Sequence, residues 1–395
     1  DHRDLHKEYR RQRQMCIRDS REAGAFSRAH LLFAVSVPLS RLELGFAALV
    51  PRLVTPIVLC DDCGGEAERA AERIARFGYT RFEILDGGIA AWKEAGYEIF
   101  SGVNVPSKAF GEFIEQEYET PRLPAAQVKA KIDAGEKVVI LDSRPMVEFN
   151  NMSIPGGSCC PGAELVYRVS DAVEDPDTLV VVNCAGRTRS IIGCQSLINA
   201  GIPNPVVALK DGTMGWHLAG FALDHGQTRL APTVSESGLA RAQAMAASVG
   251  QRFGVTKLTL PELGAFRNEA GEHSLFLLDV RSPKEFEVGH LSGSVSAPGG
   301  QLVQATDEFV GVRNARLVLI DDTGVRAVMT ASWLIQMGWD SVYVLEGGLQ
   351  SGDLETGRGE RQVLGLDGLN VPMISPLQLH SQLAEDGVRV FDLSN

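Results

Sequence analysis

The chain has 395 residues and a formal net charge of −12, with 44% hydrophobic and 22% charged residues. At roughly 100–200 residues per domain this length allows about two to four domains, and the composition excludes wholesale disorder. The acidic balance argues against a nucleic-acid partner, and no apolar run reaches the roughly 18 residues that a membrane helix needs. The 7 cysteines make an odd count that does not suit a disulfide framework, so we expect reduced thiols and a cytoplasmic protein.

Residues 1–20 differ in pattern from the rest of the chain. They are rich in charge and lack both apolar periodicity and the apolar core of a secretory signal. The stretch QMCIRDS within them resembles translated adaptor sequence from a sequencing library. We therefore expect residues 1–20, including Cys16, to be an artefactual or disordered tail, with a genuine basic tail as the alternative.

An internal repeat organises the remaining chain. Three segments share an Asp-x-Arg pair, a Phe five residues after the Arg and a Pro seventeen residues after it. The pairs are Asp19/Arg21, Asp142/Arg144 and Asp279/Arg281. After each pair come a β-rich run, a polar loop, a helical pattern and a second β-rich run ending in an acidic residue and glycine. Short, fully apolar runs between helical patterns predict an α/β fold of tandem domains, each a central parallel β-sheet flanked by helices.

The repeat also predicts the domain boundaries. We expect domains at 21–100, 123–226 and 256–352, and a truncated fourth domain at 374–395 that opens with the apolar run before Asp392. The intervening segments 101–122 and 353–373 are expected to be linkers. The Ala-rich segment 227–255 predicts a linker helix that packs between domains.

The middle repeat carries the residues that indicate chemistry. Its first β-rich run ends at Asn183 and leads into CAGRTRS, so we expect Cys184 at the strand end, 185–189 in a loop and Ser190 at the start of a helix. Ligands of parallel sheets bind at the carboxyl ends of strands, where helix N-termini present backbone N–H groups that stabilise a thiolate. Arg187 and Arg189 would add directed donors for an oxyanion. This pattern predicts a nucleophilic cysteine that meets an anionic substrate.

The repeats resemble rhodanese domains. CAGRTRS resembles the rhodanese active-site loop, and DGGIAAWKEAGYEI at 86–99 resembles the closing helix motif of the family. The resemblance implies a sulfurtransferase that moves sulfane sulfur from thiosulfate or a related small donor to cyanide or a thiol, a protein thiol included. It implies a persulfide on Cys184 and no metal or cofactor. The residues that match the substrate-binding loop are Ala185, Gly186, Arg187, Thr188, Arg189 and Ser190.

The outer repeats depart from the family pattern. Asp61 and Asp321 stand where the middle repeat has Cys184, and a carboxylate cannot carry a persulfide. The third repeat keeps Arg326 at the spacing of Arg189 but lacks the closing Trp. We therefore expect the first and third repeats to be inactive. The Asp-x-Arg pair matches a structural feature of the fold and is expected to be a buried or half-buried ion pair.

Two other functions stay open at this point. A cysteine phosphatase of the same fold is one, although those enzymes have five residues between Cys and Arg, whereas four separate Cys184 from Arg189. A non-catalytic scaffold is the other, which two inactive repeats favour and the intact CAGRTRS loop opposes.

The remaining cysteines have simpler interpretations. Cys60 and Cys63 have redox or zinc spacing but no second pair, so a strand-end and a loop cysteine are expected. Cys159 and Cys160 are expected to be exposed bystanders, with a resolving thiol as the alternative, and Cys194 is expected in the core.

Overall fold

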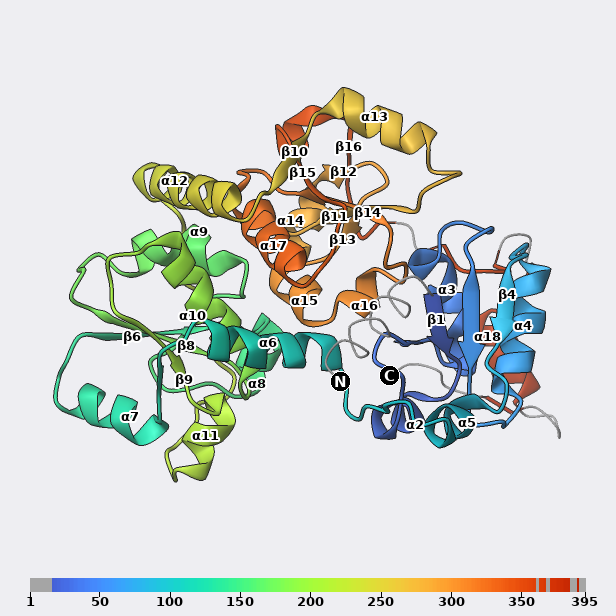
Figure 1. Ribbon diagram of the computed structural model, residues 1–395, viewed down its shortest axis with the longest axis horizontal. Helices are drawn as coiled ribbons and strands as arrows, with labels where there is room; N and C mark the ends of the chain where they lie inside the picture. Colours follow the sequence, from blue (N-terminus) through green and yellow to red (C-terminus); the bar gives the residue numbers. More distant parts are fainter. Residues whose placement is uncertain (1–15, 360–361, 367–369, 384–388, 391–395) are drawn as a thin grey trace.

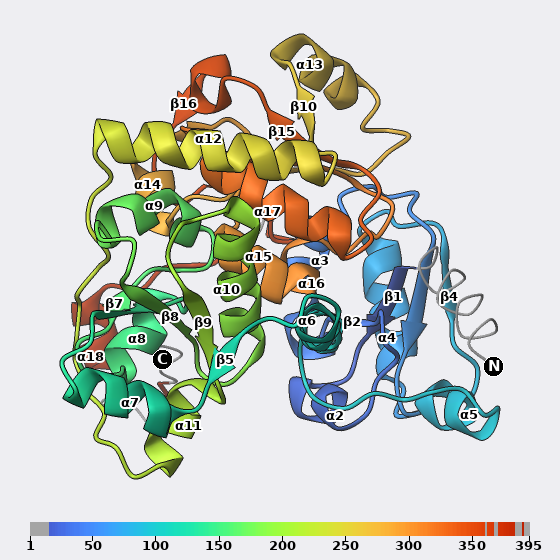
Figure 2. The ribbon, with the colours of Figure 1, turned by 60° about the vertical axis from the view of Figure 1, so that its left-hand side comes forward.

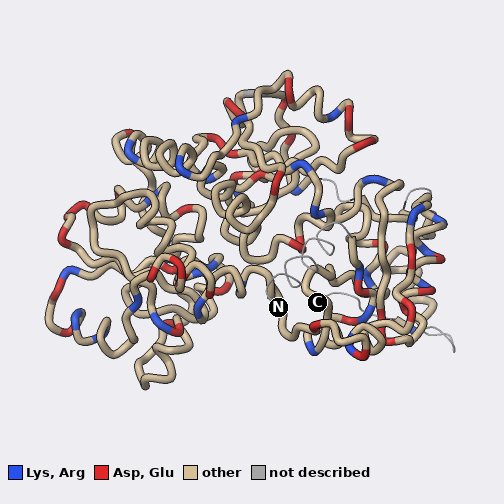
Figure 3. The backbone as a smooth tube through the Cα atoms, viewed as in Figure 1, with Lys and Arg blue, Asp and Glu red and all other residues tan. Residues whose placement is uncertain are grey.

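The computed structural model describes residues 16–359, 362–366, 370–383 and 389–390. Within them lie three α/β domains, each built on its own sheet of parallel strands (Figure 1). The predicted tandem arrangement of parallel sheets flanked by helices is therefore confirmed. Lys and Arg are interspersed with Asp and Glu over all three domains (Figure 3). Among the described residues, no helix is both long and apolar enough to cross a membrane.

The middle domain has five parallel strands in the order β5–β9–β8–β6–β7. The strands are β5 (Arg122–Leu123), β6 (Val138–Asp142), β7 (Ser158–Cys159), β8 (Leu179–Asn183) and β9 (Val206–Leu209). The helices are α7 (Ala125–Asp133), α8 (Met146–Asn151), α9 (Glu164–Ala172), α10 (Thr188–Ala200) and α11 (Gly212–Leu218). Helices cover both faces of the sheet, which is why the central strand β8 is a run of buried valines rather than an alternating pattern.

The third domain repeats this order with β10–β15–β14–β11–β13. Its strands are β10 (Thr256–Leu258), β11 (Leu275–Asp279), β13 (Val295–Ser296), β14 (Arg316–Ile320) and β15 (Val342–Leu345), and β12 (His290–Leu291) pairs antiparallel with β16 (Leu354–Glu355). Its helices are α13 (Leu260–Asn268), α14 (Pro283–Val288), α15 (Gly299–Gln304), α16 (Thr306–Phe309) and α17 (Val325–Gln336). The closing helix of the middle domain is replaced here by a single 3-10 turn, η2 (Gly348–Ser351), where the sequence lacks the closing Trp.

The first domain has four parallel strands in the order β2–β1–β3–β4. The strands are β1 (Cys16–Asp19), β2 (Val35–Ser36), β3 (Ile57–Cys60) and β4 (Phe82–Ile84), and the helices are α2 (Ala23–Arg28), η1 (Leu39–Arg41), α3 (Leu42–Leu49), α4 (Glu66–Arg76) and α5 (Gly88–Glu94). Strand β1 pairs with β2 and β3, so the expectation that residues 16–20 belong to a tail is wrong. These residues complete the hydrogen-bonding of a central strand, and residues 1–15 lie outside the described part.

Helices also occupy the segments between the domains. The predicted linker helix is α12 (Glu236–Arg252), which packs against α9 of the middle domain and α17 of the third (Figure 2). Segment 101–122, expected to be a plain linker, contains α6 (Val105–Glu117), which packs against α10. Near the end of the chain lies α18 (Pro376–Gln382), while most of the strand expected before Asp392 falls outside the described residues.

Candidate active site

Cys184 lies directly after β8, at the carboxyl edge of the middle sheet, and its exposed fraction is 2%. The helix that follows, α10, begins at Thr188, two residues earlier than the expected start at Ser190. The Cys184 thiol donates to the Ser190 hydroxyl at 3.5 Å, and that hydroxyl donates to the carbonyl of Arg187 at 2.8 Å. Of the predicted loop residues, Ser190 therefore contacts the sulfur, in the first turn of the helix that follows the loop.

The start of α11 holds the loop from the other side. The N–H and hydroxyl groups of Thr213 donate to the carbonyl of Cys184 at 2.8 and 3.1 Å. Gly212 has a φ of +55° and lies so close that an added Cβ would collide with this carbonyl and with the backbone of Gly186. Only glycine both adopts this positive φ and leaves room for the close approach at low energetic cost.

The same close approach occurs in the other domains, between Gly88 and the carbonyl of Asp61 and between Gly348 and the carbonyl of Asp321. Gly212 therefore corresponds to the second glycine of those repeats. In the sequence, the acidic residue and glycine that end the second β-rich run are Asp86-Gly87, Asp211-Gly212 and Glu346-Gly347, and the structure shifts the middle pair by one residue relative to the other two. Asp211 takes the left-handed position, at a φ of +59°, that glycine fills in the other two domains.

The third domain shows what this loop binds. The carboxylate of Asp321 accepts hydrogen bonds from the backbone N–H groups of Gly324 at 2.7 Å, Arg326 at 2.9 Å and Ala327 at 3.3 Å. The loop is thus an anion-binding cradle that its own side chain fills.

The first domain repeats the arrangement. Asp61 accepts hydrogen bonds from the N–H groups of Cys63 at 2.8 Å and Ala67 at 3.1 Å. In the middle domain the positions three, five and six residues after Cys184 are Arg187, Arg189 and Ser190. Their N–H groups stand at the same spacing as the donors that bind Asp321, with a thiol in place of the carboxylate.

Arg189 is held beside the cradle by a carboxylate that sequence reasoning missed. Its two terminal nitrogens donate to the two oxygens of Glu148 at 2.6 and 2.7 Å, and its side chain is 12% exposed. This bidentate geometry fixes the guanidinium plane. A signal was present in the sequence, because Glu285 has the spacing of Glu148 in the third repeat and pairs with Arg326.

Arg187 lies differently from the prediction. Its guanidinium pairs with two glutamates of α6, Glu112 at 2.7 Å and Glu115, and so points toward that helix. The helix comes close because Gly111 faces Thr188, where a Cβ would lie 2.8 Å from the threonine methyl. An open groove of about 440 Å³ runs between Arg187 and the acidic side of α6. The backbone of Arg187 therefore lies in the loop, whereas its guanidinium pairs with α6.

The Asp142–Arg144 pair is a buried ion pair, as predicted. Both side chains are 1% exposed, and they are joined by bonds of 2.9 and 2.7 Å. Arg144 also donates to the carbonyl of Met152 at 2.7 Å, and Asn183 donates to Asp142 at 2.8 Å. The pair ties the ends of β6 and β8 together and so supports the strand from which Cys184 emerges.

The other thiols of the middle domain are poorly placed for chemistry. Cys159 and Cys160 are buried, which corrects the expectation of exposed bystanders: β7 places the first in the sheet and the chain turns inward at the second. Burial raises the pKa of Cys159 to about 12, holds the pKa of Cys160 well above its usual range, and raises the pKa of Cys194 to about 12. Such thiols are rarely ionised near neutral pH and make poor nucleophiles.

In the first domain Cys60 is buried at the end of β3 and Cys63 is exposed in the loop, as predicted. Across the described residues, no group of three or more His, Cys, Asp or Glu side chains is arranged to hold a metal ion.

Fold and site together define a tandem α/β protein in which one loop of three carries a cysteine in an anion cradle. The model of the rhodanese-like domain family matches residues 1–95, 124–219 and 261–353. The chain belongs to this family. A crystal structure of a thiosulfate sulfurtransferase from Pseudomonas aeruginosa is 50% identical, with a TM-score of 0.92 over 97% of this chain and 72% of that one.

Curated relatives match single domains. The HTH-type transcriptional regulator Rv0324 of Mycobacterium tuberculosis is 33% identical over 101 residues, which make up 26% of this chain and 43% of the regulator. Thiosulfate sulfurtransferase GlpE of Pseudomonas aeruginosa is 31% identical over 81 residues, 20% of this chain and 70% of GlpE. The chain thus spans less than half the length of the first of these relatives.

Proposed function

We propose that the protein is a sulfurtransferase in which Cys184 of the middle domain carries sulfane sulfur as a persulfide. The observation that carries the proposal is the pair of filled cradles in the outer domains. There the loop N–H groups bind the carboxylates of Asp61 and Asp321, so the loop geometry stabilises negative charge about one side chain's length beyond the strand. A persulfide anion on Cys184 would place its charge in the same position.

Thiosulfate or a related sulfane donor fits the first half of the reaction. The Cys184 thiolate attacks the outer sulfur, the sulfur–sulfur bond of thiosulfate breaks, and sulfite leaves with the electron pair. In the second half, cyanide or a thiolate attacks the outer sulfur of the persulfide, and the Cys184 thiolate leaves. The helix N-terminus of α10 and the loop N–H groups stabilise the anionic sulfur in both halves.

The likeness to the solved thiosulfate sulfurtransferase, over 97% of this chain, supports the reaction class. The tight loop supports sulfur over phosphate, since four residues separate Cys184 from Arg189. A thiol of a partner protein is included among the proposed acceptors, together with small thiols and cyanide.

The direct experiment is sulfur loading of the intact chain. Incubation with thiosulfate should add one sulfur atom to Cys184, measured by mass spectrometry of the protein and its peptides, and cyanide should remove it. Cys184→Ser should abolish loading and turnover, because a hydroxyl does not form a persulfide. The matched controls Cys63→Ser, at an exposed thiol, and Cys194→Ser, at a buried one, should stay within a few-fold of the parent turnover. Parent-like turnover in Cys184→Ser would place the activity elsewhere.

A further inference from the structure

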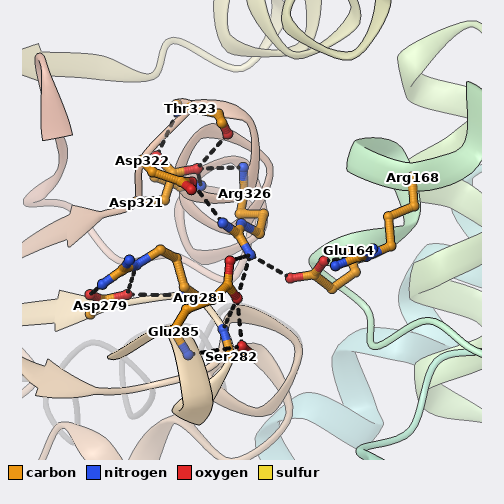
Figure 4. Close-up of polar contacts among 12 residues, drawn as sticks. Glu164, Arg168, Asp279, Arg281, Ser282, Glu285, Asp321, Asp322, Thr323 and Arg326 are labelled. Carbon is orange, nitrogen blue, oxygen red and sulfur yellow. Dashed lines mark hydrogen bonds and ion pairs between the residues drawn. The ribbon is translucent and has the colours of Figure 1, made fainter. Parts of the chain in front are cut away.

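Arg326, the arginine that the inactive third domain retains, makes a bond across a domain boundary. Its side chain has no exposed surface, and its terminal nitrogens donate to Glu285 at 3.0 Å, to Asp322 at 2.7 Å and to Glu164 at 2.8 Å (Figure 4). Two of these carboxylates lie in the third domain. Glu164 is the first residue of α9 in the middle domain, and Tyr167 of the same helix lies against the guanidinium at 4.7 Å.

The ion pair across the domain boundary has no counterpart at the equivalent arginine of the middle domain. Arg189, the equivalent of Arg326, donates to Glu148 in its own domain. Glu164 comes three residues after Pro161, and the residue three after the equivalent Pro298 is Gln301, which carries no charge. The third domain thus contributes the arginine, and the middle domain contributes the carboxylate.

The contact around this bridge is close. An added Cβ on Gly300 would lie 2.9 Å from the backbone nitrogen of Gly162, so these two backbones pack directly against each other. Farther along, the indole of Trp333 on α17 donates to the Ser196 hydroxyl on α10 at 2.8 Å. The bridge therefore sits in a packed interface rather than at a solvated edge.

Glu164, which Arg326 binds, is linked to the surroundings of Cys184 through its sequence neighbours Gly162 and Leu165. The first link is a chain of hydrogen bonds. Gly162 donates to the carbonyl of Ser143 at 3.2 Å, and Ser143 donates through both its N–H and its hydroxyl at 2.8 Å to the carbonyl of Asn183, next to Cys184.

The second link passes through α9 itself. Leu165 follows Glu164 and packs on α10 at Gly193, where a Cβ would lie 2.6 Å from its side chain. Glu164 is thus adjacent to groups that touch both the strand and the helix framing the sulfur.

We propose that the third domain, which has Asp321 where the middle domain has Cys184, uses the loop after β14 as a clamp, in which Arg326 and Glu164 are positioning residues for Cys184. A buried arginine fixes its carboxylate partners because an unpaired charge in the interior is strongly unfavourable. Fixing Glu164 restrains the start of α9. Because α9 packs on α10, this also restrains the position of the α10 N-terminus relative to the Cys184 thiol. The proposal rests on the proposed function only in treating Cys184 as the reacting group.

Glu164→Gln in the full chain tests the clamp, with Asp322→Asn as the matched control. Both changes remove one carboxylate from the same guanidinium, but only the first removes a bond between domains. Glu164→Gln also breaks the ion pair that Glu164 forms with Arg168 inside α9 at 2.7 Å, so Arg168→Met, which breaks only that pair with Glu164, is the second control. Exchange in Arg168→Met as fast as in Glu164→Gln would overturn the clamp. Hydrogen exchange of α9 and of residues 184–193 should speed up about three- to thirtyfold in Glu164→Gln and stay near the parent rate in Asp322→Asn.

The second measurement is the pH profile of Cys184 alkylation by iodoacetamide, which needs a thiolate but no sulfur transfer. In Glu164→Gln the profile should move to higher pH, by about half a unit or more, because the helix N-terminus is aimed less well at the sulfur. A loss of general stability would not shift this profile. Arg326→Met should reproduce the shift, and adding Glu164→Gln to it should add little.

Equal exchange and equal alkylation profiles in Glu164→Gln and Asp322→Asn would overturn the clamp. This outcome is separate from failure of the proposed function, which would appear as absent sulfur loading in the parent protein.

Discussion

At the scale of single residues, the cradle rather than the cysteine alone defines the site. Cys184 shares its strand-end position with Asp61 and Asp321, whose carboxylates accept hydrogen bonds from backbone N–H groups of the loop that follows. In the proposed function, a thiol in place of the carboxylate leaves these loop N–H groups available to an anionic sulfur on Cys184.

Arg189 is expected to be the side chain that contributes most to donor binding. Arg189→Ala should lower kcat/KM for thiosulfate about ten- to a hundredfold, because a charge-assisted hydrogen bond contributes about 1.5–3 kcal/mol. Glu148→Gln, which keeps an acceptor for the guanidinium but removes the charge, should cost less than about tenfold. Steady-state thiosulfate:cyanide kinetics at fixed ionic strength measure both. Arg267→Ala, at a surface arginine of the third domain that donates to the Ser292 carbonyl, is the control.

The glutamates on α6 should limit the capture of anionic donors. Glu112 and Glu115 neutralise Arg187, whose side chain is 42% exposed, so an incoming dianion competes with two carboxylates. Glu112→Gln should therefore lower KM for thiosulfate by about two- to fivefold, as expected for the loss of one partly exposed ion pair. The gain should shrink as salt is added. An unchanged KM at low salt would mean that Arg187 does not contact the donor.

At the scale of elements, the junction between the loop after Cys184 and α11 depends on one glycine. Gly212→Ala would drive a methyl group into the carbonyl of Cys184 at a φ of +55°, so α11 must move away from the loop. We expect a destabilisation of about 1–3 kcal/mol and a fall in kcat larger than the change in KM. Gly220→Ala, at a positive φ with open space around it, separates backbone strain from this collision. The free energy of unfolding and turnover of the two variants are compared.

Much of the element order could be predicted from the repeat. Fully apolar strands, the strand-end cysteine and the helix after it follow from local patterns that tertiary packing did not override. The contacts of Arg187 could not be predicted, because α6 lies in a segment outside the repeat and its approach depends on the gap left by Gly111. The strand at Cys16–Asp19 could not be predicted for the opposite reason: its local pattern is atypical, and pairing with β2 and β3 makes it a strand.

At the scale of the whole molecule, three copies of one fold differ in the residue that follows the central strand. The middle domain presents the thiol, while the third domain keeps the loop and the arginine but fills the cradle with Asp321. Two groups then meet in one buried cluster, a carboxylate in the cradle and Arg326 at the domain boundary. The free energy of this cluster depends on whether Asp321 is ionised.

Burial raises the pKa of Asp321 to about 6, against the lowering effect of Arg326 and the loop N–H groups. Below about pH 4 the native and unfolded chains both hold the proton, so the group contributes nothing to stability. Between about pH 4 and 6 the native state keeps a proton that the unfolded state has lost, so stability falls as pH rises. Above pH 6 the native state carries the full free-energy cost of ionising this buried carboxyl group, about 3 kcal/mol.

Asp321→Asn should remove this dependence. The stability of the parent relative to the variant should fall by about 3 kcal/mol as pH rises from 4 to 7, because only the parent has to ionise a buried acid. Urea unfolding followed through the fluorescence of Trp333 and Trp339, both buried in the third domain, measures the difference at each pH. The amide keeps the size of the side chain but turns a donor toward the loop N–H groups, so the variant loses some stability at every pH. That loss of stability is the same at every pH, whereas ionisation of Asp321 makes the stability of the parent change with pH. Parallel curves of stability against pH for the two proteins would show that Asp321 does not titrate in this range.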